Sequence, residues 1–170
     1  MLKKTLLKSL LIIAVGILGS QSLYYSARAS STATTSANST IKIIADISIT
    51  KDVGKDLLFA DAARSDAAQT IAAGDSTAAA FTVSGEPNHT YTVTLPANAT
   101  VFMTTGAGVA ADDQVAVNNF TSLPAAGNNG LLSGAGSQAL TVGATRAAIR
   151  ASQTQANDYT ASFNVTVTYY

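Results

Sequence analysis

The sequence predicts an all-β protein that folds as an antiparallel β-sandwich. Many short stretches alternate apolar and polar residues, as strands with one buried face do. Clusters of Gly, Pro, Asn, Asp and Ser return about every ten residues, and no stretch has a convincing helical periodicity. Short strands separated by regular turn signals are typical of a sandwich.

The first 29 residues have the pattern of a secretory signal peptide. Lys3, Lys4 and Lys8 precede an apolar run, residues 10–19, that is too short to span a bilayer as a mature helix. Ala27-Arg28-Ala29 then offers the small-x-small pattern of a cleavage site. We therefore expect export through the inner membrane and a mature chain that begins near Ser30. A retained membrane anchor is the alternative.

Removal of this segment changes the charge balance. The whole chain has 10 basic and 10 acidic residues; four basic residues precede the expected cleavage site, and no acidic residue comes before Asp46. Six basic residues remain against ten acidic ones, a net charge of −4, so the basic footprint of a nucleic-acid-binding protein is absent. The chain has no cysteine, so the exported domain must depend on core burial and strand pairing rather than on disulfides.

Residues 30–45 are predicted to form an extended N-terminal arm, followed by the sandwich domain, residues 46–170. The arm begins as a low-complexity polar run, residues 30–40, and continues into Ile41-Lys42-Ile43-Ile44-Ala45. One face of the arm, in strand phase, carries Ala33, Thr35, Ala37, Ser39, Ile41 and Ile43. Only the last two are large apolar side chains.

Alternation and turn residues then predict the strands of the domain in order. The expected strands cover residues 47–49, 57–60, 69–72, 79–84, 90–95, 101–104, 115–120 and 137–142. Residues 123–130 are expected to be a long polar connection, and residues 145–151 fit either a helix or a strand. Gly85-Glu86-Pro87-Asn88 supplies turn residues between two alternating stretches, so residues 79–84 and 90–95 are predicted to pair as a β-hairpin.

The last stretch, residues 159–170 (YTASFNVTVTYY), is the clearest strand pattern. No Gly or Pro interrupts it, and most of its residues favour strands. Its apolar face carries Tyr159, Ala161, Phe163, Val165, Val167 and Tyr169. The chain is therefore expected to end by laying one face of a long strand onto a core.

These stretches resemble a known family. The ending YTASFNVTVTYY, residues 134–145 (GAGSQALTVGAT), the pair of strands in AAFTVSGEPNHTYTVTLP and the segment ITKDVGKDLLF resemble the DUF4402 family of exported bacterial domains. That family is in turn similar to the spore-coat-U-type subunits of chaperone–usher pili. The resemblance covers most of the mature chain.

The resemblance implies an immunoglobulin-like, pilin-type sandwich that lacks one strand. In such proteins the final strand borders an open groove, which an assembly chaperone fills first and the N-terminal arm of the next subunit fills afterwards, a form of β-augmentation. It implies that residues 33–43 are the donor arm and residues 159–169 the acceptor edge. It also implies other copies of the chain, a periplasmic chaperone and an outer-membrane usher as partners, and a place on the cell surface.

The sequence offers little for catalysis or metal binding. With no Cys and one His, Cys-based dyads and multi-His metal sites are excluded. His89 is expected to be a solvated turn residue, and the paired carboxylates Asp112-Asp113 to be loop charges rather than calcium ligands. Glu86, the sole glutamate, has no evident carboxylate partner. We expect no enzyme and no cofactor.

Two functions remain open from the sequence. The first is a structural subunit of a surface fibre that polymerises by exchange of its arm. The second is a self-contained exported binding or adhesion module, in which the arm is a leader and the first strand completes its own sandwich. An enzyme is the remaining alternative.

Overall fold

The computed structural model describes residues 33–106, 110–155 and 158–170. The chain divides into two units, residues 1–40 and 41–170. The predicted signal peptide and residues 30–32 lie outside the described residues. Within the first unit, residues 33–40 have no regular secondary structure. No helix in the described part of the chain is both long and apolar enough to cross a membrane.

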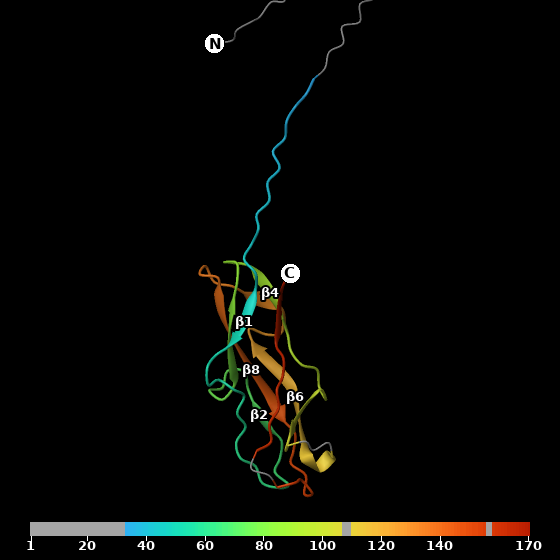
Figure 1. The fold of residues 1–170 in the computed structure, drawn as a ribbon. Helices are drawn as coiled ribbons and strands as arrows, with labels where there is room; N and C mark the ends of the chain where they lie inside the picture. Colours follow the sequence, from blue (N-terminus) through green and yellow to red (C-terminus); the bar gives the residue numbers. More distant parts are fainter. Residues whose placement is uncertain (1–32, 107–109, 156–157) are drawn as a thin grey trace, which may run out of the picture. The chain divides into compact units, whose positions relative to one another are not determined.

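The second unit is all-β, with two antiparallel sheets in a sandwich-like arrangement (Figure 1). The larger sheet has the order β1 (Ser48–Lys51), β3 (Ala79–Ser84), β8 (Ser137–Arg146), β6 (Gln114–Leu123) and β5 (Val101–Thr104). A further strand, β2 (Gln69–Ile71), pairs with the last residues of β8. The only helix in the described residues is the 3-10 turn η1 (Ala111–Asp113), which leads into β6.

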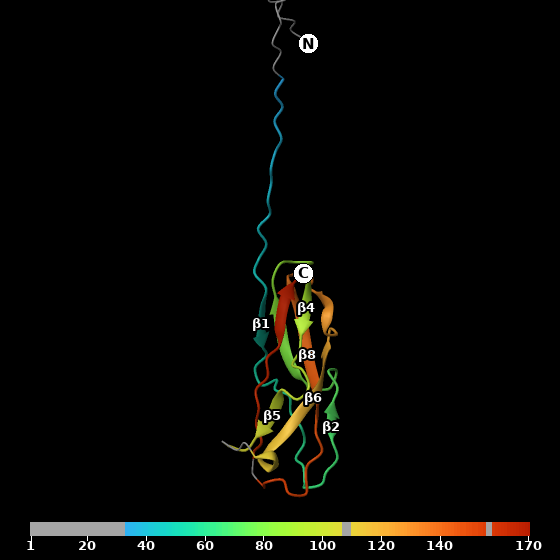
Figure 2. The same ribbon diagram turned by 90° about the vertical axis from the view of Figure 1, so that its right-hand side faces the viewer.

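The smaller sheet has the order β7 (Gly127–Leu131), β4 (Thr90–Thr94) and β9 (Thr166–Tyr169). β1 is therefore an edge strand of the larger sheet and β9 an edge strand of the smaller one. These two edges lie close together, and no ladder of hydrogen bonds joins them in the described chain. Figure 2 shows β1 and the red C-terminal strand at the same end of the domain.

The core consists of two apolar clusters. Val83, Tyr91, Val93, Leu132 and Leu140 form the first cluster. The buried ring of Tyr91 remains compatible with this apolar setting because its hydroxyl donates a hydrogen bond to Gln138 Oε1 at 2.7 Å. The second cluster contains Val101, Val117 and Ala144. Strand alternation predicted the inward positions of β3 and β4 correctly.

The predicted hairpin of residues 79–84 and 90–95 is wrong. β3 pairs with β1 and β8, whereas β4 pairs with β7 and β9, so the turn at residues 85–89 carries the chain from one sheet to the other. Alternation shows which face of a strand is buried, and that face is the same whether the next strand lies beside it or across the core. The partner was therefore not determined by the pattern.

Several other segments differ from the prediction. Residues 57–60 form no strand, and residues 41–47 are irregular up to the start of β1. β7 begins inside the stretch expected to be a connection, residues 123–130, and ends one residue beyond it. The sequence does not indicate this strand because four of its five residues, Gly127 to Gly130, are glycine or asparagine, which are rare in strands. β8 ends at Arg146, so most of residues 145–151 lies outside it.

The predicted long C-terminal strand is only partly a strand. The hydrogen-bonded part is β9, and Thr160 adds an isolated antiparallel bridge to Thr104. Between them, residues 161–165 have no ladder partner within the described residues. The side-chain pattern predicted an extended chain but not whether a neighbour is present to pair with it.

Candidate subunit interface

The C-terminal segment, residues 159–169, presents one partly covered apolar face. Tyr159, Phe163, Val165, Val167 and Tyr169 are half-buried, and the residues between them are exposed. Ala161, which was expected on the same face, is exposed. Five of the six predicted acceptor residues thus lie against the domain, although none of them is fully buried.

Among the described residues, the backbone of this segment is bonded only at its two ends. β9 pairs with β4 from Tyr91–Tyr169 to Thr94–Thr166. At the other end, the Thr160 amide donates to Thr104 O at 3.1 Å, and the Thr104 amide donates to Thr160 O at 2.9 Å. No backbone–backbone hydrogen bond is found for residues 161–165 within the described chain. An unpaired extended segment of this kind is a template for another strand.

Half-buried apolar side chains flank the segment along both core clusters. Ile47 and Ile49, from the region of β1, pack on the first cluster together with Val165 and Val167. Leu57, Phe59 and Phe163 pack on the second cluster. Phe163 also contacts Phe120, with ring centroids 5.1 Å apart. These side chains therefore pack on the two core clusters but bury only part of their apolar surface there.

The donor residues predicted in the arm are exposed. Ala33, Thr35, Ala37 and Ser39 belong to the first unit and are exposed. Ile41 and Ile43, in the second unit, are 89% and 88% exposed. Complete burial of an isoleucine side chain is worth roughly 1.5–3 kcal/mol. Neither Ile41 nor Ile43 gains this stabilisation, because both side chains are exposed.

The root of the arm is held at the Tyr169 end of the segment. Lys42 forms an ion pair with Glu86, and the Ala45 amide donates to Glu86 Oε2 at 3.1 Å. The Tyr169 hydroxyl donates to Ala45 O at 3.0 Å and accepts from the Glu86 amide at 2.6 Å. We call these four residues the root latch. A side chain on Gly85 would not fit beside it, because an added Cβ would lie 2.1 Å from the Tyr169 hydroxyl oxygen.

The root latch perturbs one titratable group. The hydrogen bond from the Lys42 ammonium, followed by that from the Ala45 amide, lowers the pKa of Glu86 below its ordinary value. The sequence indicates neither Lys42 nor Tyr169 as a partner of Glu86, because these residues lie 44 and 83 positions away from it. The only local signal is that the sole glutamate of the chain stands in a turn.

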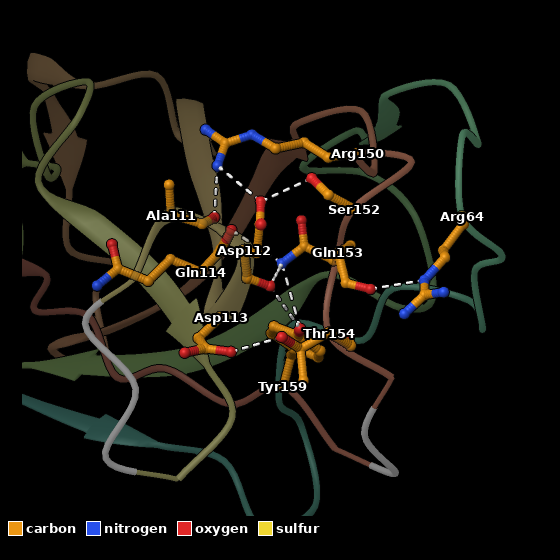
Figure 3. Close-up of polar contacts among 10 residues, drawn as sticks. All are labelled: Arg64, Ala111, Asp112, Asp113, Gln114, Arg150, Ser152, Gln153, Thr154 and Tyr159. Atoms are coloured by element: carbon orange, nitrogen blue, oxygen red, sulfur yellow. Dashed lines mark hydrogen bonds and ion pairs between the residues drawn. The ribbon is translucent and has the colours of Figure 1, made fainter.

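A polar cluster fixes the other end of the segment (Figure 3). Gln153, which is only 3% exposed, donates through Nε2 to Asp112 O, Gln114 O and the Tyr159 hydroxyl. Its backbone oxygen accepts from Arg64 Nε at 2.6 Å. The Tyr159 hydroxyl lies 2.7 Å from Thr154 O and 3.2 Å from Asp112 O. The loop after β8 is thus tied to η1 at the residue where the C-terminal segment begins.

The carboxylates of η1 belong to this cluster. Asp112 accepts a hydrogen bond from Ser152 at 2.8 Å and lies 3.8 Å from Arg150, and Asp113 accepts from Thr154 at 2.6 Å. Both carboxylates therefore connect η1 to the loop that follows β8. In the described residues no group of three or more His, Cys, Asp or Glu side chains is placed to bind a metal ion.

His89 packs edge-on against the Tyr169 ring, with centroids 5.7 Å apart.

A cavity of about 820 Å³ lies beside the Tyr159 end. Its apolar lining includes Leu57, Leu58, Phe59, Met103 and Ile149, and its polar lining includes Arg64, Arg146 and Gln153. Tyr159 and Thr160 form the part of its wall that belongs to the C-terminal segment. The sequence did not predict this cavity, because residues 57–64 were expected to begin with a strand and instead form an irregular loop.

Comparison with known proteins gives one match. Residues 57–169 match the family model described as a domain of unknown function, DUF4402, which covers more than half of the chain. The matched range includes the cavity and nearly all of the C-terminal segment and excludes the arm. No curated protein and no solved structure matches the chain.

Proposed function

Because the chain belongs to the DUF4402 family, whose description assigns no function, we propose its role from its own residues: a structural subunit of an extracellular bacterial fibre. Each copy lends its N-terminal arm to the open edge of a neighbouring copy, and the chain polymerises by donor-strand exchange. The sandwich is of the immunoglobulin-like pilin type and is completed by the donor strand.

One observation carries this proposal: the chain has both an unpaired backbone stretch beside an apolar face and a pair of exposed apolar side chains in its arm. Residues 161–165 have no regular secondary structure and lack backbone partners within the described chain, and the apolar side chains around them are only half-buried. Ile41 and Ile43 meanwhile expose almost their whole side chains. An added strand would supply hydrogen bonds to the first and burial to the second. Because the root latch holds Lys42 and Ala45 at the far end of the segment, a neighbour's arm is the proposed donor.

Export and assembly complete the proposal. The signal-peptide pattern of residues 1–29 supports passage through the inner membrane, after which the subunit reaches the cell surface. An exposed apolar edge risks aggregation before assembly. A periplasmic chaperone and an outer-membrane usher are therefore proposed as transient partners, and other copies of the chain as permanent ones.

Deletion of residues 30–44 tests the proposal. The mature chain is expected to form linked ladders of subunits in electron micrographs, and the deletion variant is expected to remain a soluble monomer with the same circular dichroism spectrum. A matched control replaces residues 30–44 by a Gly/Ser sequence of equal length, which keeps the chain length and removes the isoleucines. Fibres formed by the deletion variant would contradict the proposal.

The cavity favours one second candidate, a self-contained binding or adhesion module. Its volume falls within the range of about 300–1,000 Å³ that is typical of small-molecule sites. Such a module would be a stable monomer in sedimentation experiments. A bound ligand would slow the hydrogen–deuterium exchange of the residues that line the cavity.

A further inference from the structure

We infer that the cavity at the Tyr159 end is the receptor for Ile41 and Ile43 of the neighbouring copy. This inference rests on the proposed function and adds to it the place where the arm enters, its direction and the side chains that anchor it. The proposed occupant belongs to a second copy of this chain, rather than to a small molecule.

The residue types of the two parts match. In residues 33–43, the large apolar side chains on the donor face are Ile41 and Ile43, and both lie next to the root of the arm. Leu57, Phe59 and Met103 belong to the apolar part of the cavity lining, which also includes polar side chains such as Arg64 and Arg146. Its volume of about 820 Å³ is suited to a ligand of drug size, and two isoleucine side chains with their shared backbone form a group of that kind.

The space beside the C-terminal segment also differs between its two ends. Near Tyr169, β1 lies beside β9, and the Tyr169 hydroxyl is bonded to Ala45. Near Tyr159, the segment borders the cavity. Large donor side chains are therefore assigned to the Tyr159 end, where the cavity lies, and the small side chains Ala33, Thr35, Ala37 and Ser39 to the part of the segment where β1 lies beside β9.

This placement determines the direction of the arm. Residues 33–43 and residues 159–169 each contain eleven residues, so as strands they have equal lengths of about 3.3 Å per residue. With Ile43 beside Tyr159 of the neighbour, Ala33 lies toward the neighbour's Tyr169. The arm then runs antiparallel to the C-terminal segment.

The same placement determines the type of assembly. Each copy presents its arm root at the Tyr169 end and its cavity at the Tyr159 end. A root that binds a cavity joins unlike ends, and such a contact, when repeated, produces an open filament wherever its rotation does not close a ring. In the opposite direction, the root of one copy would meet the Tyr169 end of the other, and two copies could exchange arms reciprocally in a closed dimer.

Engineered disulfides test the inference, because the natural chain has no cysteine. The first variant carries Ile41→Cys and Leu58→Cys; Leu58 lines the cavity and is exposed, so its replacement should leave the fold intact. The matched control carries Ala33→Cys and Leu58→Cys. A disulfide requires Cα atoms about 4.4–6.8 Å apart. Thr160→Cys replaces Leu58→Cys if the latter prevents folding, since Thr160 is also exposed and lines the cavity.

Fibres of each variant are first imaged, then oxidised and analysed on a non-reducing denaturing gel. The Ile41→Cys variant should give a covalent ladder that a reductant abolishes, and the Ala33→Cys control should remain a monomer. A ladder only in the control would overturn the inference by showing the reverse direction. Fibres without a ladder in either variant, or an internal disulfide within one copy, would overturn it and leave the fibre proposal standing. Absence of fibres in the unmodified chain would overturn both.

A second measurement does not depend on cysteine. Ile41→Ala and Leu58→Ala should each lower the temperature at which fibres dissociate, and the double variant should lose less than the sum of the two shifts because the side chains contact each other. Additive shifts would contradict the contact.

Discussion

The two ends of the C-terminal segment differ in how completely they are bonded. At the Tyr169 end, β9 pairs with β4, and the root latch joins the Tyr169 hydroxyl to Glu86 and Ala45. At the Tyr159 end, one bridge at Thr160 is followed by residues 161–165 without ladder partners in the described chain, beside a cavity of about 820 Å³. The same alternating sequence thus has one end that is paired throughout, at β9, and one half, residues 159–165, in which the unpaired residues 161–165 follow the Thr160 bridge beside the cavity; we call this half the open end.

This difference suggests a division of roles along one strand. The bonded end holds the root of the chain's own arm, and the open end is the proposed receptor for another arm. Variants at each end should therefore affect different properties. Changes at the open end should weaken assembly, and changes at the bonded end should weaken the monomer or release its arm.

The largest expected effect comes from the anchors proposed for the open end. Ile41→Ala together with Ile43→Ala should destabilise each junction between copies by about 3–6 kcal/mol, because each buried isoleucine contributes roughly 1.5–3 kcal/mol. The temperature of fibre dissociation measures the change. Thr35→Ala with Ser39→Ala is the matched control in the same arm and should change little. If both double variants lower the dissociation temperature equally, Ile41 and Ile43 are not the anchors of the arm.

The next effect should come from the cluster that fixes Tyr159. Gln153→Ala leaves Gln114 O without this donor and takes one of several donors from Asp112 O, which still accepts from the Thr154 amide. One polar group left unsatisfied costs about 1–3 kcal/mol, so we expect a loss of about 1–3 kcal/mol in urea unfolding of the arm-deleted monomer. The nearby Gln155 is exposed, so Gln155→Ala is the control and should be close to neutral. A neutral Gln153→Ala would show that the cluster does not hold the open end.

A smaller effect is expected at the bonded end. Tyr169→Phe removes the hydroxyl that accepts from the Glu86 amide and donates to Ala45, at a cost of about 1–2 kcal/mol in unfolding free energy. Tyr170→Phe is the control: it removes a hydroxyl that donates to the backbone oxygen of Asn128, but the Tyr170 side chain is exposed. The unfolding free energy should therefore fall less in this variant. If the two variants behave alike, the root latch adds nothing to stability.

Acidification should have the smallest effect. The lowered pKa of Glu86 means that the folded chain holds the carboxylate deprotonated more strongly than the unfolded chain does. The linked stability is present above the ordinary pKa of 4.5 and is lost as the pH falls below that value toward the lowered pKa. Unfolding curves of the native chain and of Glu86→Gln, measured from pH 7 to pH 3, should converge at low pH. Parallel curves would contradict the ion pair with Lys42.

Alternation in the sequence predicted which residues face the core but not which strands pair. The inward positions of β3 and β4 follow from Phe81, Val83, Tyr91 and Val93, yet these strands lie in different sheets. The period of two is a property of one strand, whereas pairing depends on chain segments that are distant in sequence. For the same reason, the pattern of residues 159–170 predicted an extended chain without showing that residues 161–165 lack a partner.

The donor and acceptor positions of the candidate interface are expected from alternation and from the resemblance to pilins, and they stay predictions. The contacts that surround them in the folded chain have no such signal in the sequence. The root latch joins Glu86 to Lys42, Ala45 and Tyr169 across long stretches of sequence, and Gln153 is a polar residue in a loop. Neither has a local signal, because its role depends on contacts that only the folded chain brings together.

Hydrogen–deuterium exchange at the amides of residues 161–165 tests the central claim most directly. These amides should exchange rapidly in the arm-deleted monomer and become protected in fibres of the mature chain, whereas the amides of β9 that are bonded to β4 should be protected in both. Protection of residues 161–165 in the monomer, or rapid exchange that persists in the fibre, would contradict the claim that a neighbour's arm completes this edge.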